Sequence, residues 1–207
     1  MAETSFDVLI IGAGISGINT AYRLQEQCPD RTYAILEARH ALGGTWDLFK
    51  YPGIRSDSDL HTFGFPFNPW TEEKAIADGG SIKAYMKETA AKYDIDRHIQ
   101  YHTKVVSANW STDQQRWFLE LDNQGTKKFY NSQFVVWCTG YYDYNHALPA
   151  KIPGIDNFQG QVIHPQHWPE DLDYKDKNVV IIGSGATAIT LLPNLAKDAC
   201  MLRSSPL

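Results

Sequence analysis

Two glycine-rich sequences constrain the fold of this chain more than any other feature. They are Gly12-x-Gly14-x-x-Gly17 and Gly183-x-Gly185-x-x-Ala188. Each follows a short run rich in β-branched residues and leads into apolar residues at helical spacing. The glycine spacing alone arises often by chance, but the order of strand, glycine turn and helix is typical of a dinucleotide-binding βαβ unit. The sequence therefore predicts two Rossmann-like units.

The glycines of the first sequence have different predicted tasks. Gly12 permits a tight turn, Gly14 leaves the backbone open to a pyrophosphate, and Gly17 lets the helix approach the strand. In the second sequence Ala188 stands at the third position, where it is predicted to let the helix approach the strand. Because a helix N-terminus carries free N–H groups and partial positive charge, we expect phosphate groups to bind at both turns.

The residue at the end of the next strand distinguishes the two units. Glu37 lies 20 residues after Gly17, where a carboxylate can accept the ribose hydroxyls of FAD or NAD and repels a 2'-phosphate. At the corresponding place in the second unit stand Arg203 and Ser204, and an arginine there can pair with a 2'-phosphate. We therefore expect FAD at the first unit and NADPH at the second.

The segment between the two turns shows both helical and strand periodicity. Apolar residues from Ile82 to Tyr93 mark one face of a helix, and alternation follows from Ile99 onward. We expect strands at Ile99–Asn109, Trp117–Leu121, Thr126–Tyr130 and Phe134–Cys138, with a turn at Asp122–Gly125. The patterned segment Gly43–Asp59 reads as a long loop.

These elements predict an α/β chain. We expect a Rossmann-like FAD-binding domain with three-layer ββα sandwich character, followed by the start of a second Rossmann-like, NADP-binding domain. The expected boundaries are 1–143 for the FAD-binding domain, 144–172 for a linker and 173–207 for the incomplete NADP-binding domain.

Composition excludes several classes of function. The net charge of −5 and the absence of a basic cluster argue against a nucleic-acid partner, and no apolar run reaches the length of a membrane span. The three cysteines, Cys28, Cys138 and Cys200, are widely spaced, so we interpret them as buried small hydrophobes in a cytoplasmic protein. The histidine pairs 98/102 and 164/167 lack a third ligand, so no metal is expected.

Two longer motifs carry a resemblance to a known family. The first is Phe158-x-Gly160-x-x-x-His164-x-x-x-Trp168-Pro169. The second combines Gly43-Gly44-x-Trp46, Tyr51-Pro52-Gly53 and Asp57. With these motifs the chain resembles the N-terminal part of a class B flavoprotein monooxygenase of the Baeyer-Villiger type, and it is most similar to the ethionamide-activating monooxygenase subgroup.

The resemblance implies an activity and a set of site residues. NADPH would reduce FAD, and one oxygen atom of O2 would pass to a ketone, giving an ester or lactone, or to the sulfur of a thioether or thioamide. The implied catalytic residues are Arg55, Asp57, His164 and Trp168, with Asp57 supporting an active-site arginine and His164 and Trp168 coupling the linker to nicotinamide movement. The implied cofactor residues, with those already given, are Gly12, Gly14, Ser16, Gly17, Glu37, Gly44, Thr45, Trp46, Asp47, Leu48, Ser56, Asp57 and Val105 for the first unit and Gly183, Ser184, Gly185, Ala186, Thr187, Ala188, Ile189, Arg203 and Ser204 for the second.

Two other classes remain for comparison. Complete members of the family continue past this point and supply the active-site arginine there, so a catalytically incompetent nucleotide-binding fragment is the alternative. A disulfide reductase shares the doubled glycine turn but needs a close cysteine pair, which this sequence lacks. The family's Gln-Arg-Ser-Pro appears here as Arg203-Ser204-Ser205-Pro206, which leaves open whether Arg203 or Ser204 meets the 2'-phosphate. Substrate identity and oligomeric state do not follow from the sequence.

Overall fold

The computed structural model describes residues 4–148 and 150–205. They form two compact units, one of residues 4–47 and 82–141 and the other of residues 48–81, 142–148 and 150–205. The predicted domain boundaries at 143/144 and 172/173 stay predictions. The segment 48–81, which precedes most of the first unit's strands in the sequence, is grouped with the second unit.

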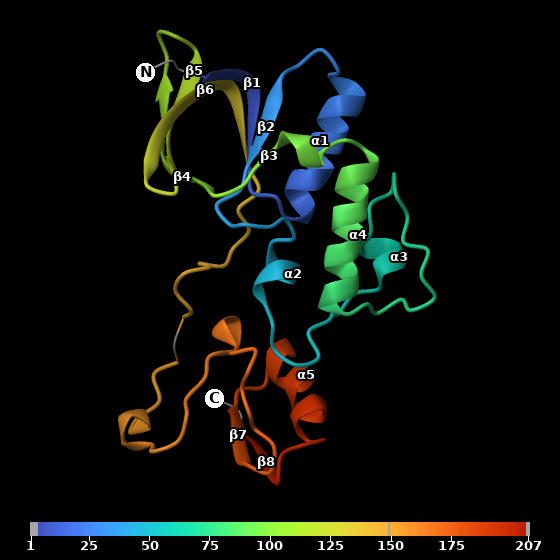
Figure 1. Ribbon diagram of the computed structural model, residues 1–207, viewed down its shortest axis with the longest axis vertical. Coiled ribbons are helices and arrows are strands. Elements are labelled where there is room, and N and C mark those ends of the chain that lie inside the picture. Colours follow the sequence, from blue (N-terminus) through green and yellow to red (C-terminus); the bar gives the residue numbers. More distant parts are fainter. Residues whose placement is uncertain (1–3, 149, 206–207) are drawn as a thin grey trace. The chain divides into compact units, whose positions relative to one another are not determined.

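The first unit contains a six-stranded sheet in the order β3-β2-β1-β6-β5-β4 (Figure 1). Strands β1, β2, β3 and β6 are parallel, while β4, β5 and β6 form an antiparallel meander. The bounds of its elements are β1 Thr4–Ile11, α1 Ile15–Gln27, β2 Tyr33–Leu36, α2 Thr45–Leu48, α4 Gly79–Lys92, η1 Asp96–His98, β3 Ile99–Gln100, β4 Thr103–Ser111, β5 Arg116–Asn123 and β6 Thr126–Trp137. The last residue of α2 and the first residues of α4 belong to the second unit.

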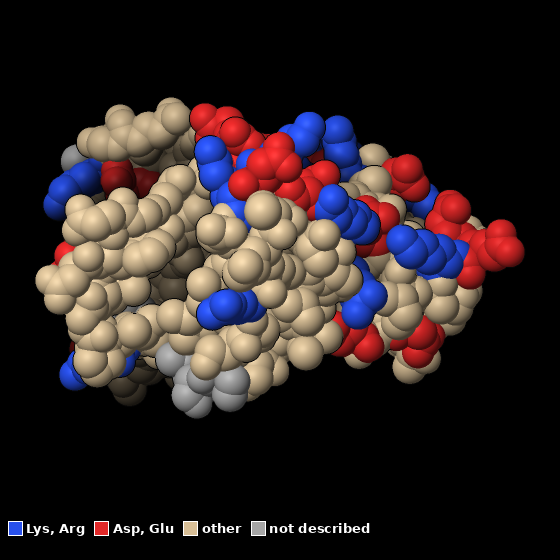
Figure 2. Space-filling model, turned by 90° about the horizontal axis from the view of Figure 1, so that it is seen from below, with Lys and Arg blue, Asp and Glu red and all other residues tan. Residues whose placement is uncertain are grey.

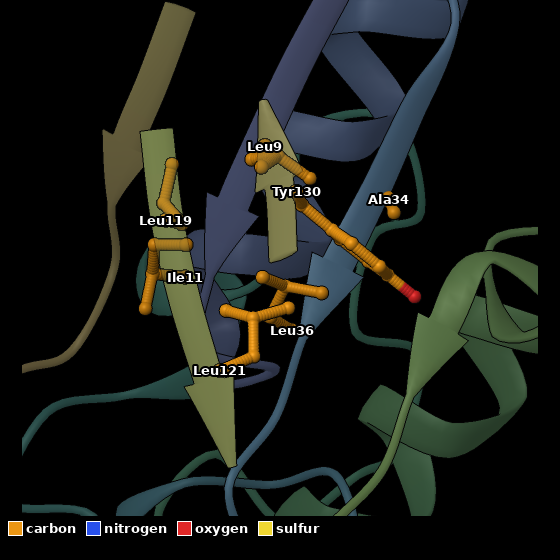
Figure 3. Packing of buried hydrophobic residues seen from close by; sticks show 7 residues of the cluster. All are labelled: Leu9, Ile11, Ala34, Leu36, Leu119, Leu121 and Tyr130. Carbon is orange, nitrogen blue, oxygen red and sulfur yellow. The ribbon is translucent and has the colours of Figure 1, made fainter. Parts of the chain in front are cut away.

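The two faces of the parallel strands meet different partners. Ile10 points toward α1, since its side chain lies next to Gly17, and Ile18 and Ala21 of α1 are buried. The opposite face belongs to a cluster that we call the meander core, in which β1 and β2 residues meet β5 and β6 residues (Figure 3). Its members are Leu9, Ile11, Ala34, Leu36, Leu119, Leu121 and Tyr130. Helix, parallel strands and meander therefore stack as the predicted ββα layers.

Two strand predictions were wrong in their boundaries. The expected strand Ile99–Asn109 is divided by His102, whose φ of +54° lies in the left-handed region, so β3 and β4 lie at opposite edges of the sheet. The two strands expected at Thr126–Tyr130 and Phe134–Cys138 are one 12-residue strand, β6. Its first half pairs with β5 and its second half continues along β1, which joins the meander to the parallel strands. The turn predicted at Asp122–Gly125 is confirmed, with Gln124 and Gly125 both at positive φ.

The second unit contains a parallel pair of strands connected by a helix. These are β7 Asn178–Ile182, α5 Ala186–Leu195 and β8 Met201–Ser205, with Ile182 opposite Ser205. The same unit holds α3 Leu60–Phe63, η2 Ile155–Asn157 and η3 Pro165–His167. A cluster that we call the α5 core consists of Tyr51, Ile181, Leu191 and Leu195. The expected long loop Gly43–Asp59 is shortened by α2, and α3 begins directly after it at Leu60.

The surface, the helices and the cysteines add further observations. Lys and Arg side chains lie beside Asp and Glu side chains on the face shown in Figure 2. None of the helices between residues 4 and 205 that the structure describes is long and apolar enough to cross a bilayer. Cys28 and Cys200 are exposed, so their interpretation as buried hydrophobes was wrong. Cys28 lies directly after α1, and Cys200 lies directly before β8. Cys138 is half-buried, and burial raises the pKa of its thiol.

Candidate functional site: two glycine corners

Both glycine turns adopt the same backbone construction. The first glycine has a positive φ, +107° at Gly12 and +140° at Gly183. Its N–H donates to the last carbonyl of the following strand, from Gly12 to Leu36 and from Gly183 to Ser205, at 2.8 Å in each case. This hydrogen bond brings the turn against the end of β2 or β8, so that the helix N-terminus faces the edge of the parallel pair where dinucleotides bind.

The second glycine of each turn is the N-cap of its helix. Gly14 and Gly185 share φ −78° with ψ −172° and −177°, and each accepts an N–H from the residue four positions later at 3.1 Å. A Cβ on Gly14 would come within 4 Å only of the Gly44 Cα, at 3.8 Å, and one on Gly185 would meet nothing within 4 Å. The space that a side chain would fill is therefore open at both corners, as a pyrophosphate bound to the helix N-terminus requires.

The third position differs between the corners for a steric reason. A Cβ on Gly17 would overlap the Gly12 carbonyl oxygen, so α1 must carry glycine there. Gly12 is itself confined, because its own Cβ would lie 2.5 Å from the Cys138 carbonyl oxygen at the end of β6. At the second corner a Cβ on Gly183 would meet nothing within 4 Å, and α5 carries Ala188 at the third position.

Glu37 lies at the first corner, as the spacing predicts. The side chain is only 7% exposed, and its two oxygens accept backbone N–H groups from Ala13 at 2.8 Å and Arg39 at 2.9 Å. A carboxylate has about four acceptor positions, so two are used by the backbone and the others can serve ribose hydroxyls. The same carboxylate therefore holds the glycine turn and presents negative charge at the corner.

The predicted contact Asp47 is an anchor of the neighbouring turn. Its carboxylate is nearly fully buried and lies 2.7 Å from Arg39 Nη2 and 2.5 Å from Lys83 Nζ of α4. The turn before it is closed by the N–H groups of Trp46 and Asp47, which donate to Gly43 and Gly44. Arg39 also donates to the Gly44 carbonyl, at 3.4 Å. Arg39 and Lys83 were missed by sequence reasoning, because their separation from Asp47 along the chain follows no motif.

The other residues predicted for the first site are spread over both units. Ser16 is exposed in the first turn of α1, and Thr45 and Trp46 are partly buried on α2. Val105 packs against the meander core beside a β-bulge. Leu48, Ser56 and Asp57 belong to the second unit.

Within the second unit the predicted residues fall into three places. The Ser56 hydroxyl is buried and bonds both the N–H and the carbonyl of Ser58, whereas Arg55 and Asp57 are exposed on the same loop. Ser184 and Ala186 to Ile189 form the second turn and the start of α5. Arg203 and Ser204 lie opposite Val180 and Ile181 inside β8, which continues one residue further, to Ser205.

The motif residues His164 and Trp168 have local packing partners. His164 caps η3, accepting the Gln166 N–H at its Nδ1. Gln166 is buried and donates to the Asp143 carbonyl at 2.5 Å. Trp168 packs against the α5 core and meets Tyr174 edge-on. Within the ranges that the structure describes, no three His, Cys, Asp or Glu residues lie close enough to hold a metal ion.

Comparison with known proteins identifies the class that this fold and these corners define. The flavin-binding monooxygenase-like family model matches residues 6–205. The chain therefore belongs to the flavin-binding monooxygenase-like family. The predicted family is thereby confirmed, and so is the predicted fold class, since the solved structures described below share this fold.

Two curated proteins are similar to this chain over nearly its whole length. The chain is 55% identical over 204 residues to the FAD-containing monooxygenase EthA of Mycobacterium tuberculosis (strain H37Rv), and 50% identical over 209 residues to the probable FAD-binding monooxygenase AlmA of an Acinetobacter species. These alignments cover 97% and 99% of this chain. The chain spans 42% of the length of each of these relatives.

Two solved monooxygenase structures are also similar to this chain. An NADP-bound steroid monooxygenase matches with a TM-score of 0.83 and 31% identity over 97% of this chain and 38% of its own. A cyclohexanone-bound cyclohexanone monooxygenase matches with a TM-score of 0.84 and 27% identity over 98% of this chain and 39% of its own.

Proposed function

We propose that this chain acts in an FAD-dependent, NADPH-consuming monooxygenase that transfers one oxygen atom of O2 to a small molecule. The observation that carries the proposal is the shared construction of the Gly12–Gly17 and Gly183–Ala188 corners within a member of a flavin monooxygenase family. Two separate dinucleotides need two such corners, whereas a dehydrogenase that uses only NAD needs one.

The charge at each corner supports the assignment of FAD to the first and NADPH to the second. Glu37 places a buried carboxylate beside the Ala13 N–H, where a 2'-phosphate would be repelled. In the second unit Arg203 and Ser204 are exposed in β8. Arg203 lies two residues before the strand ends at Ser205, and not directly after the strand end as Glu37 does, but an arginine there still suits a phosphate. Both helices begin without an acidic side chain in the first turn, which leaves their N-termini favourable for anions.

The residues of this chain would bind and orient, while FAD supplies the redox chemistry. When bound and reduced, FAD activates dioxygen for transfer to the substrate. Gly14 and Gly185 would admit the two pyrophosphates, Glu37 would hold the adenosine ribose of FAD, and the loop with Arg55 and Asp57 would present charged groups on the second unit. Asp57 would orient an arginine that stabilises developing negative charge.

The proposed substrates are ketones and sulfur compounds. Among the similar solved structures are a cyclohexanone monooxygenase and a steroid monooxygenase, names that fit ketone oxygenation to an ester or lactone. Thioether or thioamide sulfur is the second acceptor, which the resemblance of the Gly43–Asp59 segment to the ethionamide-activating subgroup implies. We place the reaction in the cytoplasm, since all three cysteines are free thiols.

The experiment is oxygen uptake and NADPH oxidation by the purified chain with added FAD and a panel of cyclic ketones and thioethers. Turnover of NADPH with oxygenated product would support the proposal. A chain that retains yellow FAD and binds NADP+ without turnover would instead be a nucleotide-binding part of such an enzyme, a candidate favoured by the 42% coverage of its relatives. Colourless protein that FAD does not reconstitute would contradict both.

Replacement of Asp57 by alanine is expected to impair oxygenation more than FAD retention. Asp57 is exposed on its loop, so its removal leaves the glycine corners and both cores intact. We expect product formation to fall by at least about tenfold, since lost electrostatic support costs that or more. Product yield is compared with bound FAD per chain. Asp59→Ala, which removes only the N-cap of α3, is the matched control, and unchanged yield in D57A would exclude Asp57 from the mechanism.

A further inference from the structure

A cavity of about 450 Å³, which we call the edge cavity, lies in the first unit at the amino ends of β1 and β2. Its walls come from β1, the end of α1, the connection from α1 to β2, and η1 (Figure 1). Its volume falls within the range of small-molecule sites. Because the first glycine turn follows the carboxyl end of β1, the edge cavity is a different site from the FAD corner.

The charged residues that line the edge cavity are both arginines. Arg31 and Arg97 are exposed, and no carboxylate is among the described residues that line it. The Asp7 carboxylate holds the neighbouring segment: it accepts the N–H and the hydroxyl of Thr32, each at 2.8 Å, and lies 3.6 Å from Arg31 Nη1. Asp96 accepts the backbone N–H of Arg97. The lining itself is therefore positive, and guanidinium groups pair well with carboxylates.

Aromatic rings form another part of the lining. The rings of Tyr33 and His98 stack with their centroids 4.3 Å apart and their planes at 26°, and Phe6 also lines the cavity. Burial lowers the pKa of His98, and the Arg97 charge lowers it further, so this ring is largely neutral at pH 7. His98 remains partly exposed. A flat apolar ring can therefore pack against this wall in an offset stack.

The Tyr33 hydroxyl adds a hydrogen-bond donor to the aromatic wall. Gln25 Nε2 donates to this hydroxyl at 2.8 Å, which uses one of its acceptor positions. Burial raises the pKa of Tyr33 to about 12, so the hydroxyl keeps its proton at neutral pH. Since a tyrosine hydroxyl donates as well as accepts, its O–H can serve an oxygen atom of a ligand.

We propose that the edge cavity binds a small aromatic carboxylate, with the ring against His98 and Phe6 and the carboxylate toward Arg31 and Arg97. A phosphate ion would meet the arginines and leave the aromatic wall uncovered, whereas a neutral ring would leave the arginines unpaired. FAD can be bound at the same time, because the three steps of β2 from Tyr33 to Leu36 span about 10 Å. The inference goes beyond the proposed oxygenation and depends on neither nucleotide assignment.

The test uses benzoate as the probe and two cysteines of the full chain as reporters. Cys28 lines the edge cavity, whereas Cys200 belongs to the second unit, and both thiols are exposed. Alkylation by iodoacetamide is followed at each cysteine by mass spectrometry. At a benzoate concentration ten times its dissociation constant, alkylation of Cys28 should slow about tenfold, because the cavity is then empty in about one chain in eleven. Alkylation of Cys200 should not change.

Two matched variants test the positive lining. Arg97→Gln keeps a polar side chain and removes the charge. It should raise the benzoate concentration for half-protection about 3- to 10-fold, because a charged hydrogen bond on an exposed side chain contributes at the low end of its range. Arg23→Gln removes an exposed guanidinium of α1 that pairs with Glu26 and does not line the cavity, so it should leave that concentration unchanged. Equal effects of the two variants would overturn the inference.

Other ligands test the two halves of the proposed recognition. Benzyl alcohol lacks the charge and inorganic phosphate lacks the ring, so each should protect Cys28 less than benzoate does. Equal protection by either one would overturn the inference. So would the absence of protection at about 10 mM benzoate, which is ten times a dissociation constant of about 1 mM.

Addition of FAD separates this inference from the proposed function. Saturating FAD should leave the protection of Cys28 by benzoate unchanged. If FAD abolishes the protection, benzoate binds at the first corner and the inference is wrong. A chain that binds neither FAD nor NADP+ but in which benzoate protects Cys28 would contradict the proposed function and support the edge cavity as a binding site.

Discussion

Asp47→Ala is expected to lower the free energy of unfolding of the first unit by about 3 kcal/mol, because removing one partner of a buried ion pair leaves the remaining charge uncompensated. The Asp47 side chain is 3% exposed and sits between Arg39 and Lys83, whose side chains are 21% and 35% exposed. The two cations retain some hydration, which keeps the loss at the lower end of the range for such pairs. Urea unfolding followed by circular dichroism measures the change.

Two additional variants test the cause of this loss. Asp113→Ala removes an exposed carboxylate from the turn between β4 and β5 and should change stability by less than about 0.5 kcal/mol. Adding Lys83→Met to Asp47→Ala removes one of the stranded cations, so the double variant should be less destabilised than the sum of the single changes. Strict additivity would show that Asp47 and Lys83 do not act together.

Glu37→Gln is expected to weaken FAD binding by about 10- to 100-fold, because a hydrogen bond to a charged group contributes about 1.5–3 kcal/mol. The amide also brings an NH2 group toward one of two backbone donors, Ala13 N–H or Arg39 N–H, so that one donor loses its acceptor. The glycine turn should therefore loosen as well. Titration of the apoprotein with FAD, followed by flavin fluorescence, gives the dissociation constant.

The control for this change is Glu26→Gln on the exposed side of α1. It removes the same charge from the same unit and loses surface interactions, among them the pair with Arg23. FAD affinity should stay within about twofold of the unchanged chain, since long-range effects of exposed charges are screened. Equal weakening by E26Q and E37Q would mean that net charge, and not the carboxylate at the corner, sets the affinity.

The parts of the fold that follow from local rules could be predicted from the sequence. The runs before Gly12 and Gly183 predict β1 and β7, and the glycine spacing predicts the turns and the helix starts at Ile15 and Ala186. Glu37 falls beside Ala13 because the lengths of α1 and β2 fix its distance from Gly12. These features depend on residues close in sequence, where chirality and hydrogen bonding leave few choices.

The parts that depend on distant residues could not be predicted. One strand, β6, joins the parallel and the antiparallel parts of the six-stranded sheet, and nothing local indicates that Thr126–Tyr130 continues into Phe134–Trp137. The pairing of Asp47 with Lys83 and the seat of Tyr51 on α5 are tertiary contacts without a sequence period. Asp47 was expected to line FAD, whereas its carboxylate forms an ion pair with Lys83.

The most direct test of two distinct nucleotide corners is a pair of matched alanine variants, Gly14→Ala and Gly185→Ala. Both glycines have φ of −78° and open space at the Cβ, so each alanine should be accepted by the fold and should intrude only on a bound pyrophosphate. Dissociation constants for FAD and for NADP+ are measured on both folded variants. We expect G14A to lose FAD affinity and keep NADP+ affinity, and G185A to show the reverse. Loss of both ligands in both variants, or of neither in either, would contradict the account.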